Sequence, residues 1–381
     1  MGMVGGGRGA FIGGVHRMAA ALDGQIELVC GAFSSSAEKS RLSGEDLYLD
    51  PDRVYANFEE MIEREKALPA DVRMDFVSIV TPNHMHFPPA KMALENGFHV
   101  VCDKPITLNL EQAEELQRLV DETGLLFALT HNYTGYPMVK QARAMIANGD
   151  LGDIRKVVVE YPQGWLSTNL EATDQKQAAW RVDPEKSGAG GALGDIGTHA
   201  ENLAEYVTGL QITEMCADLT AFGAGRVLDD DANILLRFDN GAKGVLHASQ
   251  ISTGEENNLN IRVYGTEASI QWFQMEPNTL IVRHLEQPTQ YLRTGVSELY
   301  PAATAAQRIP AGHPEGYLEA FANIYKYFAH CLNARLDGTE PDPLYTDFPS
   351  VADGVRGMQF ISHAVASDRS DQKWHALTEG V

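Results

Sequence analysis

The sequence has few cysteines and no long apolar run, and both absences narrow the class of protein. Its 381 residues include four cysteines, which are widely separated and form no CxxC pair. Such a set is neither a disulfide framework nor a zinc site, and it favours a reducing compartment. No apolar run approaches the roughly 18 residues that a transmembrane helix needs. We therefore expect no membrane-spanning segment.

Positive charge is also scarce. There are 30 lysines and arginines against 52 aspartates and glutamates, a formal net charge of -22. A surface of this sign repels the phosphates of nucleic acids and of anionic membranes, so we expect neither as a partner. The first residues lack the charged and apolar regions of a signal peptide, which favours a cytoplasmic protein. The first expected strand, at 1–4, is short, which leaves open whether the natural chain begins upstream.

The composition is that of a globular protein with two domains. Hydrophobic residues make up 44% and charged residues 22% of a chain that is too long for one ordinary core. Within residues 1–133, short apolar runs alternate with helical patterns. The strands are expected at 25–33, 75–81, 98–102 and 125–130, and the helices at 10–22, 58–66, 87–96 and 110–123. This alternation predicts parallel strands with right-handed crossovers, which is an α/β Rossmann domain.

The pattern changes near residue 134. After a helix expected at 137–147, strand-like segments follow with few helices between them, at 154–161, 214–222, 232–238, 243–252, 260–264 and 268–273. They predict a large, mostly antiparallel, open-faced sheet with one covered face. Helices expected at 198–207 and 315–332 supply the cover, and a last helix at about 350–367 can pack back on the first domain. We therefore assign 134–381 to an α+β domain for substrate binding and oligomerisation.

A glycine loop follows the first strand. It fits G-x-G-x-x-A with Gly5, Gly7 and Ala10 at the fixed positions, and with Arg8 and Gly9 inside the loop. The first glycine permits a tight turn, the second lets a pyrophosphate approach the backbone, and the small third residue lets the helix pack on its strand. Because the loop lies between a strand and a helix, we interpret it as a dinucleotide-binding loop and not merely a connecting turn.

The second strand leaves the choice between NAD and NADP open. An acidic residue at its end would bind the ribose hydroxyls of NAD. The residues found there are instead Phe33, Ser34, Ser35 and Ser36, with Lys39 and Arg41 nearby. Hydroxyls and cations suit the additional phosphate of NADP. Alternatively, the serines form an ordinary turn before the next helix and reach the ribose of NAD.

Three further motifs complete a family pattern. Thr81-Pro82-Asn83-His84 ends the third strand, Asp103-Lys104-Pro105 ends the fourth, and Gly-Asp-Ile-Gly-Thr-His at 194–199 leads into a helix. In order and spacing, over essentially the whole chain, they resemble the Gfo/Idh/MocA oxidoreductase family, which includes glucose-fructose oxidoreductase and inositol dehydrogenases. The resemblance implies an NAD- or NADP-dependent dehydrogenase. Its substrate would be a secondary hydroxyl of a sugar, anhydrosugar, glycoside or inositol, oxidised by hydride transfer.

The resemblance also implies three catalytic residues. Lys104, at the end of a parallel strand, would hydrogen-bond the reacting hydroxyl and favour its alkoxide character. His199 would be the general base, since an imidazole titrates near neutral pH. Asp195, four residues earlier, would orient it or bind the neighbouring hydroxyl. Without the motif, Asp195 could equally cap its helix and His199 pack in a polar core. Asp103 replaces the family's glutamate and keeps the charge on a shorter arm.

The remaining candidates are assigned by their place in the pattern. Residues at the ends of the Rossmann strands are expected to bind the cofactor, namely Thr81, Pro82, Asn83, His84, Asp103 and Asn132. Tyr133 at the domain boundary, and Trp165, Arg181 and His313 of the second domain, are expected to contact the substrate, although a tryptophan is more often buried core. His84 and His86 have no third ligand at suitable spacing, so no metal is expected.

Two rival functions would use the same residues. Some members of such a family oxidise a sugar transiently with bound NAD in order to cleave a glycoside. Others bind cofactor and sugar without turnover, but a sensor of this kind would be expected to lose the lysine or the histidine. The segment 187–195 resembles the sugar-oxidising branches, which favours a hexopyranoside over a phosphorylated substrate. Open sheet faces of such second domains often pair, so a homodimer or homotetramer is expected.

Overall fold

The computed structural model describes residues 1–173, 176–296 and 298–377. They form two compact units, one of Met1–Asn132 with Phe321–Val355, and the other of Tyr133–Ala320 with the chain from Arg356 onward. The sequence pattern places all of 134–381 in the second domain, whereas 321–355 lies in the first unit. Helical periodicity reveals that a helix has a buried face, but not which sheet covers that face. In the described residues, no helix is long and apolar enough to cross a membrane.

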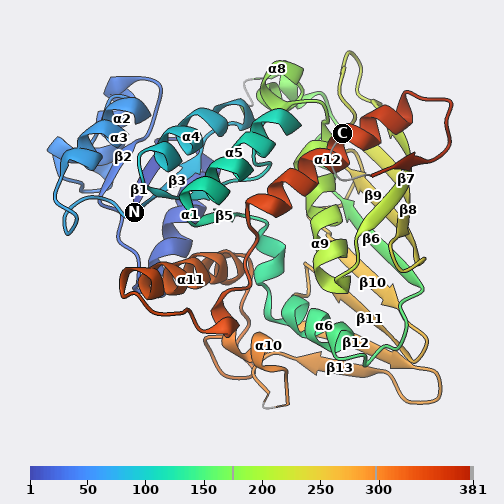
Figure 1. Ribbon diagram of the computed structural model, residues 1–381. Helices are drawn as coiled ribbons and strands as arrows, with labels where there is room; N and C mark the ends of the chain where they lie inside the picture. The colour runs from blue at the N-terminus through green and yellow to red at the C-terminus, as the bar shows by residue number, and fades with distance from the viewer. Residues whose placement is uncertain (174–175, 297, 378–381) are drawn as a thin grey trace. The chain divides into compact units, whose positions relative to one another are not determined.

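Five parallel strands form the sheet of the first unit, in the order β2-β1-β3-β4-β5 (Figure 1). They are β1 (Gly2–Gly5), β2 (Cys30–Ala32), β3 (Phe76–Val80), β4 (His99–Cys102) and β5 (Phe127–Leu129). Every residue of β3 and β4 is buried, as expected for strands covered on both faces. The strand order reverses beside β1, where open α/β sheets bind their ligands. The predicted Rossmann fold is confirmed.

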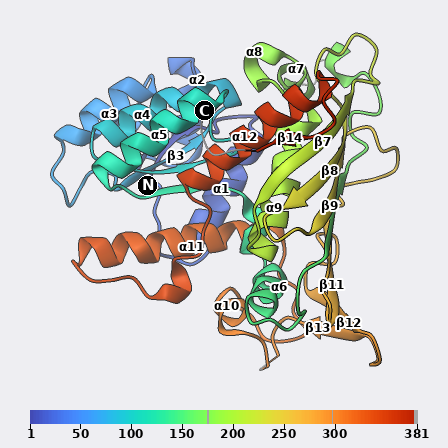
Figure 2. The ribbon, with the colours of Figure 1, turned by 45° about the vertical axis from the view of Figure 1, so that its right-hand side comes forward.

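Helices lie on both faces of this sheet. One layer contains α3 (Phe58–Ala67), α4 (Phe87–Glu95) and α5 (Leu110–Thr123). The other face holds α1 (Phe11–Ala21) and residues 321–336 of α11 (Tyr317–Leu336) (Figure 2). The Tyr325 and Phe328 rings of α11 lie 6.5 and 4.9 Å from the Phe76 ring of β3. This packing of α11 on the sheet is why 321–355 belongs to the first unit.

A helix that the sequence pattern does not predict, α2 (Ala37–Asp46), follows β2. Its buried residues are Ser40, Ser43 and Gly44. Because none of them is apolar, the hydrophobic periodicity that marks the other helices is missing here.

The second unit is built on a nine-stranded sheet in the order β13-β12-β11-β10-β6-β9-β8-β7-β14. The strands are β6 (Lys156–Pro162), β7 (Ile212–Thr220), β8 (Asp231–Phe238), β9 (Lys243–Ser249), β10 (Asn260–Tyr264), β11 (Ala268–Phe273), β12 (Thr279–His284), β13 (Gln290–Arg293) and β14 (His375–Ala376). All pairs are antiparallel except β6 with β9, which run parallel. The predicted large, mostly antiparallel sheet is confirmed, with β12, β13 and β14 added. Strand β13 is largely exposed, so it lacks the alternation that marks a half-buried strand.

One face of the nine-stranded sheet is covered by α6 (Pro137–Ala147) and α9 (Thr198–Thr208) (Figure 2). Along β8, Ala232, Ile234 and Leu236 are buried, while Asn233 and Leu235 are exposed. Such alternation is expected when only one face is packed. Residues Leu193–Gly197, just before α9, form a π-helical turn, a feature that often marks functional sites. The remaining helices are α7 (Lys176–Arg181), α8 (Pro184–Ser187), α10 (Pro301–Ala305) and α12 (Val351–Asp368).

Candidate active site

The glycine loop at the end of β1 forms a cradle at the carboxyl edge of the first sheet. Gly5 has a φ of +85°, which side chains rarely adopt. Gly7 donates its N–H to the carbonyl of Phe33 at 3.1 Å, and a Cβ on Gly7 would lie 2.7 Å from that oxygen. At Gly9, by contrast, a Cβ would meet no heavy atom within 4 Å. The loop is therefore closed toward β2 and open where a pyrophosphate would approach the start of α1.

Close packing of α1 on the glycine loop is provided by Gly13 and not, as the motif predicts, by Ala10. Ala10 is exposed and precedes the first residue of the helix. A Cβ on Gly13 would lie 2.3 Å from the Cα of Gly6, so only glycine fits there. The helix begins at Phe11, so Gly13 lies in its first turn.

The residues after β2 form a capped turn. The Ser34 hydroxyl accepts a hydrogen bond from the N–H of Ser36 at 3.2 Å, and Ser36 in turn caps α2 by accepting from the N–H of Lys39. Ser35 and the Lys39 side chain are exposed, and Phe33 is buried. Ser34 and Ser36 thus form a capped turn before α2.

Two arginines near this turn, Arg8 and Arg41, are paired with carboxylates. Arg41 forms ion pairs with Glu38 and Glu45 of its own helix. Arg8 of the glycine loop donates to Asp46, with its Nη2 2.6 Å from Oδ1. Both arginines are therefore already in ion pairs within the protein.

Asp103, at the end of β4, fixes the turn that carries Lys104. Its Oδ1 accepts from the N–H of Lys104 at 3.0 Å and from the Thr130 hydroxyl at 2.8 Å, and it lies 3.9 Å from Nε2 of His16. Burial alone would raise the pKa of Asp103, but His16 and Lys104 outweigh it and hold this pKa below its usual range. The carboxylate therefore stays ionised and ties the ends of β4 and β5 together.

His86 joins the loop after β3 to the loop after β4. Its Nδ1 lies 2.7 Å from the carbonyl oxygen of Pro105, and its Nε2 lies 2.8 Å from that of Thr81. Burial lowers the pKa of His86, against the opposing effect of Asp103 and the two carbonyls. Among the described residues, no group of three or more histidine, cysteine or carboxylate side chains could hold a metal ion.

The turn after β3 carries the other predicted cofactor residues. Asn83–Met85 form a 3-10 turn, and the Thr81 hydroxyl donates to the carbonyl of Met85 at 3.0 Å. In the part of the chain that the structure describes, Nδ1 of His84 and Nδ2 of Asn132 are buried without a hydrogen-bond partner. Buried polar groups without partners are costly, and a ligand that completes their bonds removes this cost. With the glycine cradle, these residues fit a dinucleotide along the carboxyl edge of the sheet.

In the second unit, Asp195 is held by side chains from two other segments. Its Oδ2 accepts from Nε of Arg181 at 3.1 Å and from Nε2 of Gln250 at 2.8 Å. The guanidinium of Arg181 lies 4.3 Å from the centre of the Trp180 ring and 5.8 Å from that of Trp165. Asp195 therefore does not cap its helix. The structure instead brings it together with Arg181 and Trp165, both predicted substrate residues.

His199, in the first turn of α9, packs against two tyrosines. Its ring lies 4.8 Å from the Tyr133 ring in an edge-on arrangement, and 6.2 Å from the Tyr161 ring. The two tyrosine hydroxyls are hydrogen-bonded to each other, and Tyr161 donates to Oδ1 of Asn257 at 2.7 Å. Burial raises the pKa of Tyr133 to about 12, so its hydroxyl stays protonated.

The residues that the sequence motifs miss here are Tyr161, Gln250 and Asn257. Tyr161 lies near the end of β6, and Gln250 directly follows β9. These are the two parallel strands of the sheet, so their carboxyl ends meet at one edge. Polar residues at two strand ends are visible in the sequence, but they become informative only when the pairing of the strands is known.

His313 lies apart from this cluster. It is exposed, and its Nδ1 is 3.1 Å from the carbonyl oxygen of Pro310 in its own loop. No contact with Asp195 or His199 is present among the described residues, and its role toward the substrate stays a prediction.

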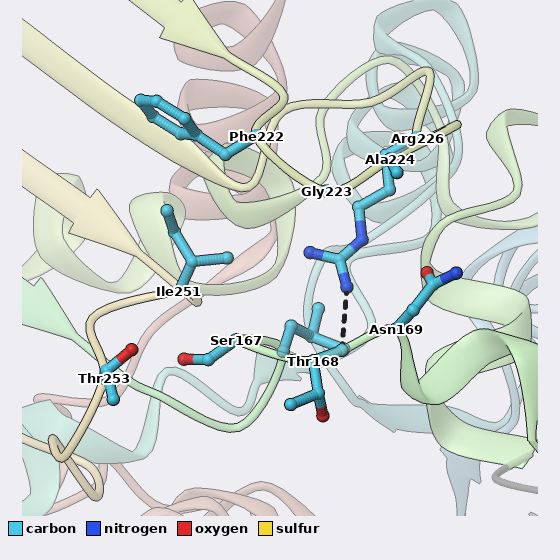
Figure 3. Close-up of a pocket in the computed structure, with 10 residues that line it drawn as sticks. Ser167, Thr168, Asn169, Phe222, Gly223, Ala224, Arg226, Ile251 and Thr253 are labelled. Carbon is cyan, nitrogen blue, oxygen red and sulfur yellow. Dashed lines mark hydrogen bonds between the residues drawn. The ribbon is translucent and has the colours of Figure 1, made fainter.

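A pocket of about 270 Å³ elsewhere in the second unit is lined by loops that include Ser167, Phe222 and Ile251 (Figure 3). It contains Arg226, which forms ion pairs with Glu171 at 2.7 Å and Asp230 at 2.9 Å. The charge of Arg226 is therefore neutralised within the protein, and the pocket shares no lining residue with the Asp195–His199 cluster.

Comparisons with known proteins find matches for both units. Residues 1–133 match a model described as an oxidoreductase family with an NAD-binding Rossmann fold, and residues 139–271 match the GFO/IDH/MocA C-terminal domain. The oxidoreductase YfiI of Bacillus subtilis (strain 168) is 34% identical over 375 residues, which cover 98% of this chain and 95% of that protein.

Solved structures show the same similarity. The crystal structure of an inositol dehydrogenase homolog from Azotobacter vinelandii with NAD+ has a TM-score of 0.93 at 37% identity, covering 98% of this chain and 96% of that chain. A structure from the same organism, described as an inositol dehydrogenase homolog with NADH and myo-inositol, has a TM-score of 0.90 at 36% identity, with the same coverage.

Proposed function

Since the chain belongs to the Gfo/Idh/MocA family of oxidoreductases and its first domain is an NAD-binding Rossmann domain, we propose that it oxidises a secondary hydroxyl of an inositol or a sugar. The observation that carries this proposal is the cluster around Asp195 and His199. It offers a carboxylate, an imidazole and several neutral hydrogen-bonding side chains, which suit a ring with many hydroxyls. The myo-inositol bound by the Azotobacter vinelandii homolog supports the same substrate class.

In the proposed reaction, each residue acts on one hydroxyl group. Bound NAD supplies the hydride acceptor. The imidazole of His199 takes the proton of the reacting hydroxyl. The ammonium of Lys104 stabilises the negative charge that develops on its oxygen. Asp195, oriented by Arg181 and Gln250, accepts a hydrogen bond from the neighbouring hydroxyl and keeps the ring in position.

We also propose that NAD is preferred over NADP. The arginines beside the turn after β2, Arg8 and Arg41, are bound by Asp46, Glu38 and Glu45. An additional phosphate on the ribose would have to compete with these carboxylates, and it would meet their negative charge. The turn offers serine hydroxyls and backbone amides, which suit an unphosphorylated ribose.

A substrate screen tests this function. Inositols, free hexoses, anhydrosugars and hexose phosphates are each mixed with NAD or NADP, and formation of the reduced cofactor is followed by absorbance. We expect turnover of at least one uncharged polyol with NAD. Cleavage of a chromogenic glycoside without net reduction of NAD would support the glycoside-cleaving rival instead.

Replacing the catalytic candidates tests their roles. Lys104→Ala and His199→Ala should each lower kcat by about 10²–10⁴-fold, because each removes a group that acts on the reacting hydroxyl. Binding of NAD, measured by calorimetry, should change little for His199→Ala, which lies outside the Rossmann domain. Lys66→Ala, which changes an exposed residue of α3, is the control and should keep its rate with NAD. Near-normal rates in both catalytic variants would show that the roles are wrongly assigned.

A further inference from the structure

The segment that leads into the π-helical turn and α9 is hydrogen-bonded to one residue of a distant loop, Asp229. Asp229 accepts hydrogen bonds through Oδ1 from the N–H of Gly191 and through Oδ2 from the N–H of Leu193, both at 2.7 Å. Its main-chain carbonyl accepts from the N–H of Ala192 at 2.8 Å. The N–H groups of 191, 192 and 193, at the start of the π-helical turn, therefore all donate to Asp229, which acts as a helix cap.

The fit between Asp229 and the glycine-rich segment is close. A Cβ on Gly191 would lie 2.0 Å from the carbonyl oxygen of Asp229, so no other residue can occupy that position without moving the loop. The carbonyl of Gly191 then accepts the N–H of Asp195 at 2.9 Å. Hydrogen bonds thus connect Asp229 through Gly191 to Asp195. His199 lies one helical turn after Asp195.

The protonation of Asp229 affects these bonds. Burial raises its pKa to about 6, with a further upward contribution from Asp230, while the amides of Leu193 and Gly191 oppose the shift. Above this value the carboxylate accepts both side-chain hydrogen bonds. As the pH falls through about 6, one oxygen takes up a proton and can no longer accept from the amide that faces it.

We propose that Asp229 is a positioning residue, which sets the orientation of Asp195 and His199 by holding the amides of 191–193. The expected effect on kcat rests on the proposed dehydrogenase function, whereas the expected effect on the structure of 191–199 does not. A catalytic group must stay within a fraction of an ångström of its productive place, and a shift of about 1 Å can cost about 100-fold in rate.

The neighbouring Asp230 offers a matched control. It accepts from the N–H groups of Phe222 and Gly223 at 2.9 and 2.8 Å and pairs with Arg226, so it stabilises the same loop. No hydrogen bond joins its side chain to 191–193 among those of the described residues. Asp230→Asn should therefore lower stability without moving the catalytic helix.

The experiment compares Asp229→Asn with Asp230→Asn. Hydrogen–deuterium exchange, read by mass spectrometry on peptides spanning 188–203, should become at least tenfold faster in Asp229→Asn and stay unchanged in Asp230→Asn. For Asp229→Asn, kcat should fall at least tenfold while KM for NAD stays within twofold. For Asp230→Asn, kcat should stay within twofold of the parent value, even if Tm falls. In the parent protein, exchange of this segment, corrected for its intrinsic pH dependence, should also speed up below pH about 6.

Equal effects of the two substitutions, or unchanged exchange in Asp229→Asn, would overturn the proposal. If Asp229→Asn does not fold, Asp229→Glu takes its place, and parent-like exchange and kcat in that variant would overturn the proposal equally. A parent protein that oxidises no polyol with NAD would refute the proposed function. In that case the exchange measurements would still decide the role of Asp229.

Discussion

One buried histidine of the first unit, His99, is kept neutral by its surroundings. His99, in β4, is buried, and its Nδ1 accepts from the N–H of Leu126 at 2.8 Å. Burial, together with the positive charge of Arg335, lowers the pKa of His99 to about 4. A protonated ring could not accept that hydrogen bond, so the neutral form belongs to the native fold.

We expect His99 to make the protein less stable in acid. As the pH falls below about 6.5, the unfolded chain takes up a proton at His99, whereas the native state does so only near pH 4. The free energy of unfolding should therefore fall by about 2–3 kcal/mol across this window because of His99. Urea unfolding at pH 7 and pH 4.5 measures the difference.

His99→Gln is the matched variant, since its amide oxygen can still accept a hydrogen bond but does not titrate. It should lose this part of the pH dependence. Equal loss of stability in both proteins between pH 7 and pH 4.5 would contradict the assignment to His99.

Among the elements, α1 carries two adjacent glycines in opposite surroundings. A Cβ on Gly13 would lie 2.3 Å from Gly6, whereas a Cβ on Gly14 would meet no heavy atom within 4 Å. Gly13→Ala should therefore push α1 away from the glycine loop. We expect it to lower stability by about 1–3 kcal/mol and to weaken NAD binding about tenfold or more.

Gly14→Ala is the control, since it makes the same substitution at the next residue of the helix. Alanine is the better helix former by about 0.5–1 kcal/mol, so this variant should be as stable as the parent protein or more stable. Thermal unfolding and calorimetric titration with NAD measure both quantities. If Gly13→Ala and Gly14→Ala behaved alike, close packing at Gly13 would not be what shapes the loop.

The elements also show where the sequence is informative and where it is not. The helices at 87–95 and 110–123 have apolar residues at helical spacing and are predicted within one residue of their bounds. Helix α2 is missed because its buried face is made of serine and glycine. Local periodicity reports what a face buries only when the buried side chains are apolar.

The candidate site divides in the same way. Lys104, Asp195 and His199 belong to local motifs, so the sequence alone nominates them. Gln250 and Asp229 do not, because each reaches the site through contacts between segments far apart in the chain. Such contacts follow from strand pairing and loop packing, which a single sequence does not encode in any local pattern.

On the scale of the whole molecule, the face of the nine-stranded sheet opposite α6 and α9 carries exposed apolar side chains. Leu235, Val245 and Val158 lie side by side on the adjacent strands β8, β9 and β6. Leu235 is 46% exposed. A row of apolar side chains on an uncovered face is typical of a surface that pairs with another protein. We propose that a second copy of the chain covers it.

Leu235→Glu tests this pairing. A carboxylate at the end of the apolar row would have to be buried without a partner, so we expect the variant to shift toward the monomer. Light scattering after size-exclusion chromatography gives the mass directly. Val72→Glu, which changes an exposed apolar residue of the first unit, should keep the parent mass. A parent protein that is already monomeric would contradict the proposal.

The division of the chain into units has a consequence for its synthesis. The first unit needs residues 321–355, because α11 covers the sheet beside Phe76. A ribosome must therefore deliver the whole stretch 133–320 before the segment that completes the Rossmann sheet emerges. Nascent chains usually fold domain by domain from the N-terminus. Here the unit that emerges first must wait for residues 321–355, with the part of its sheet that α11 covers still exposed.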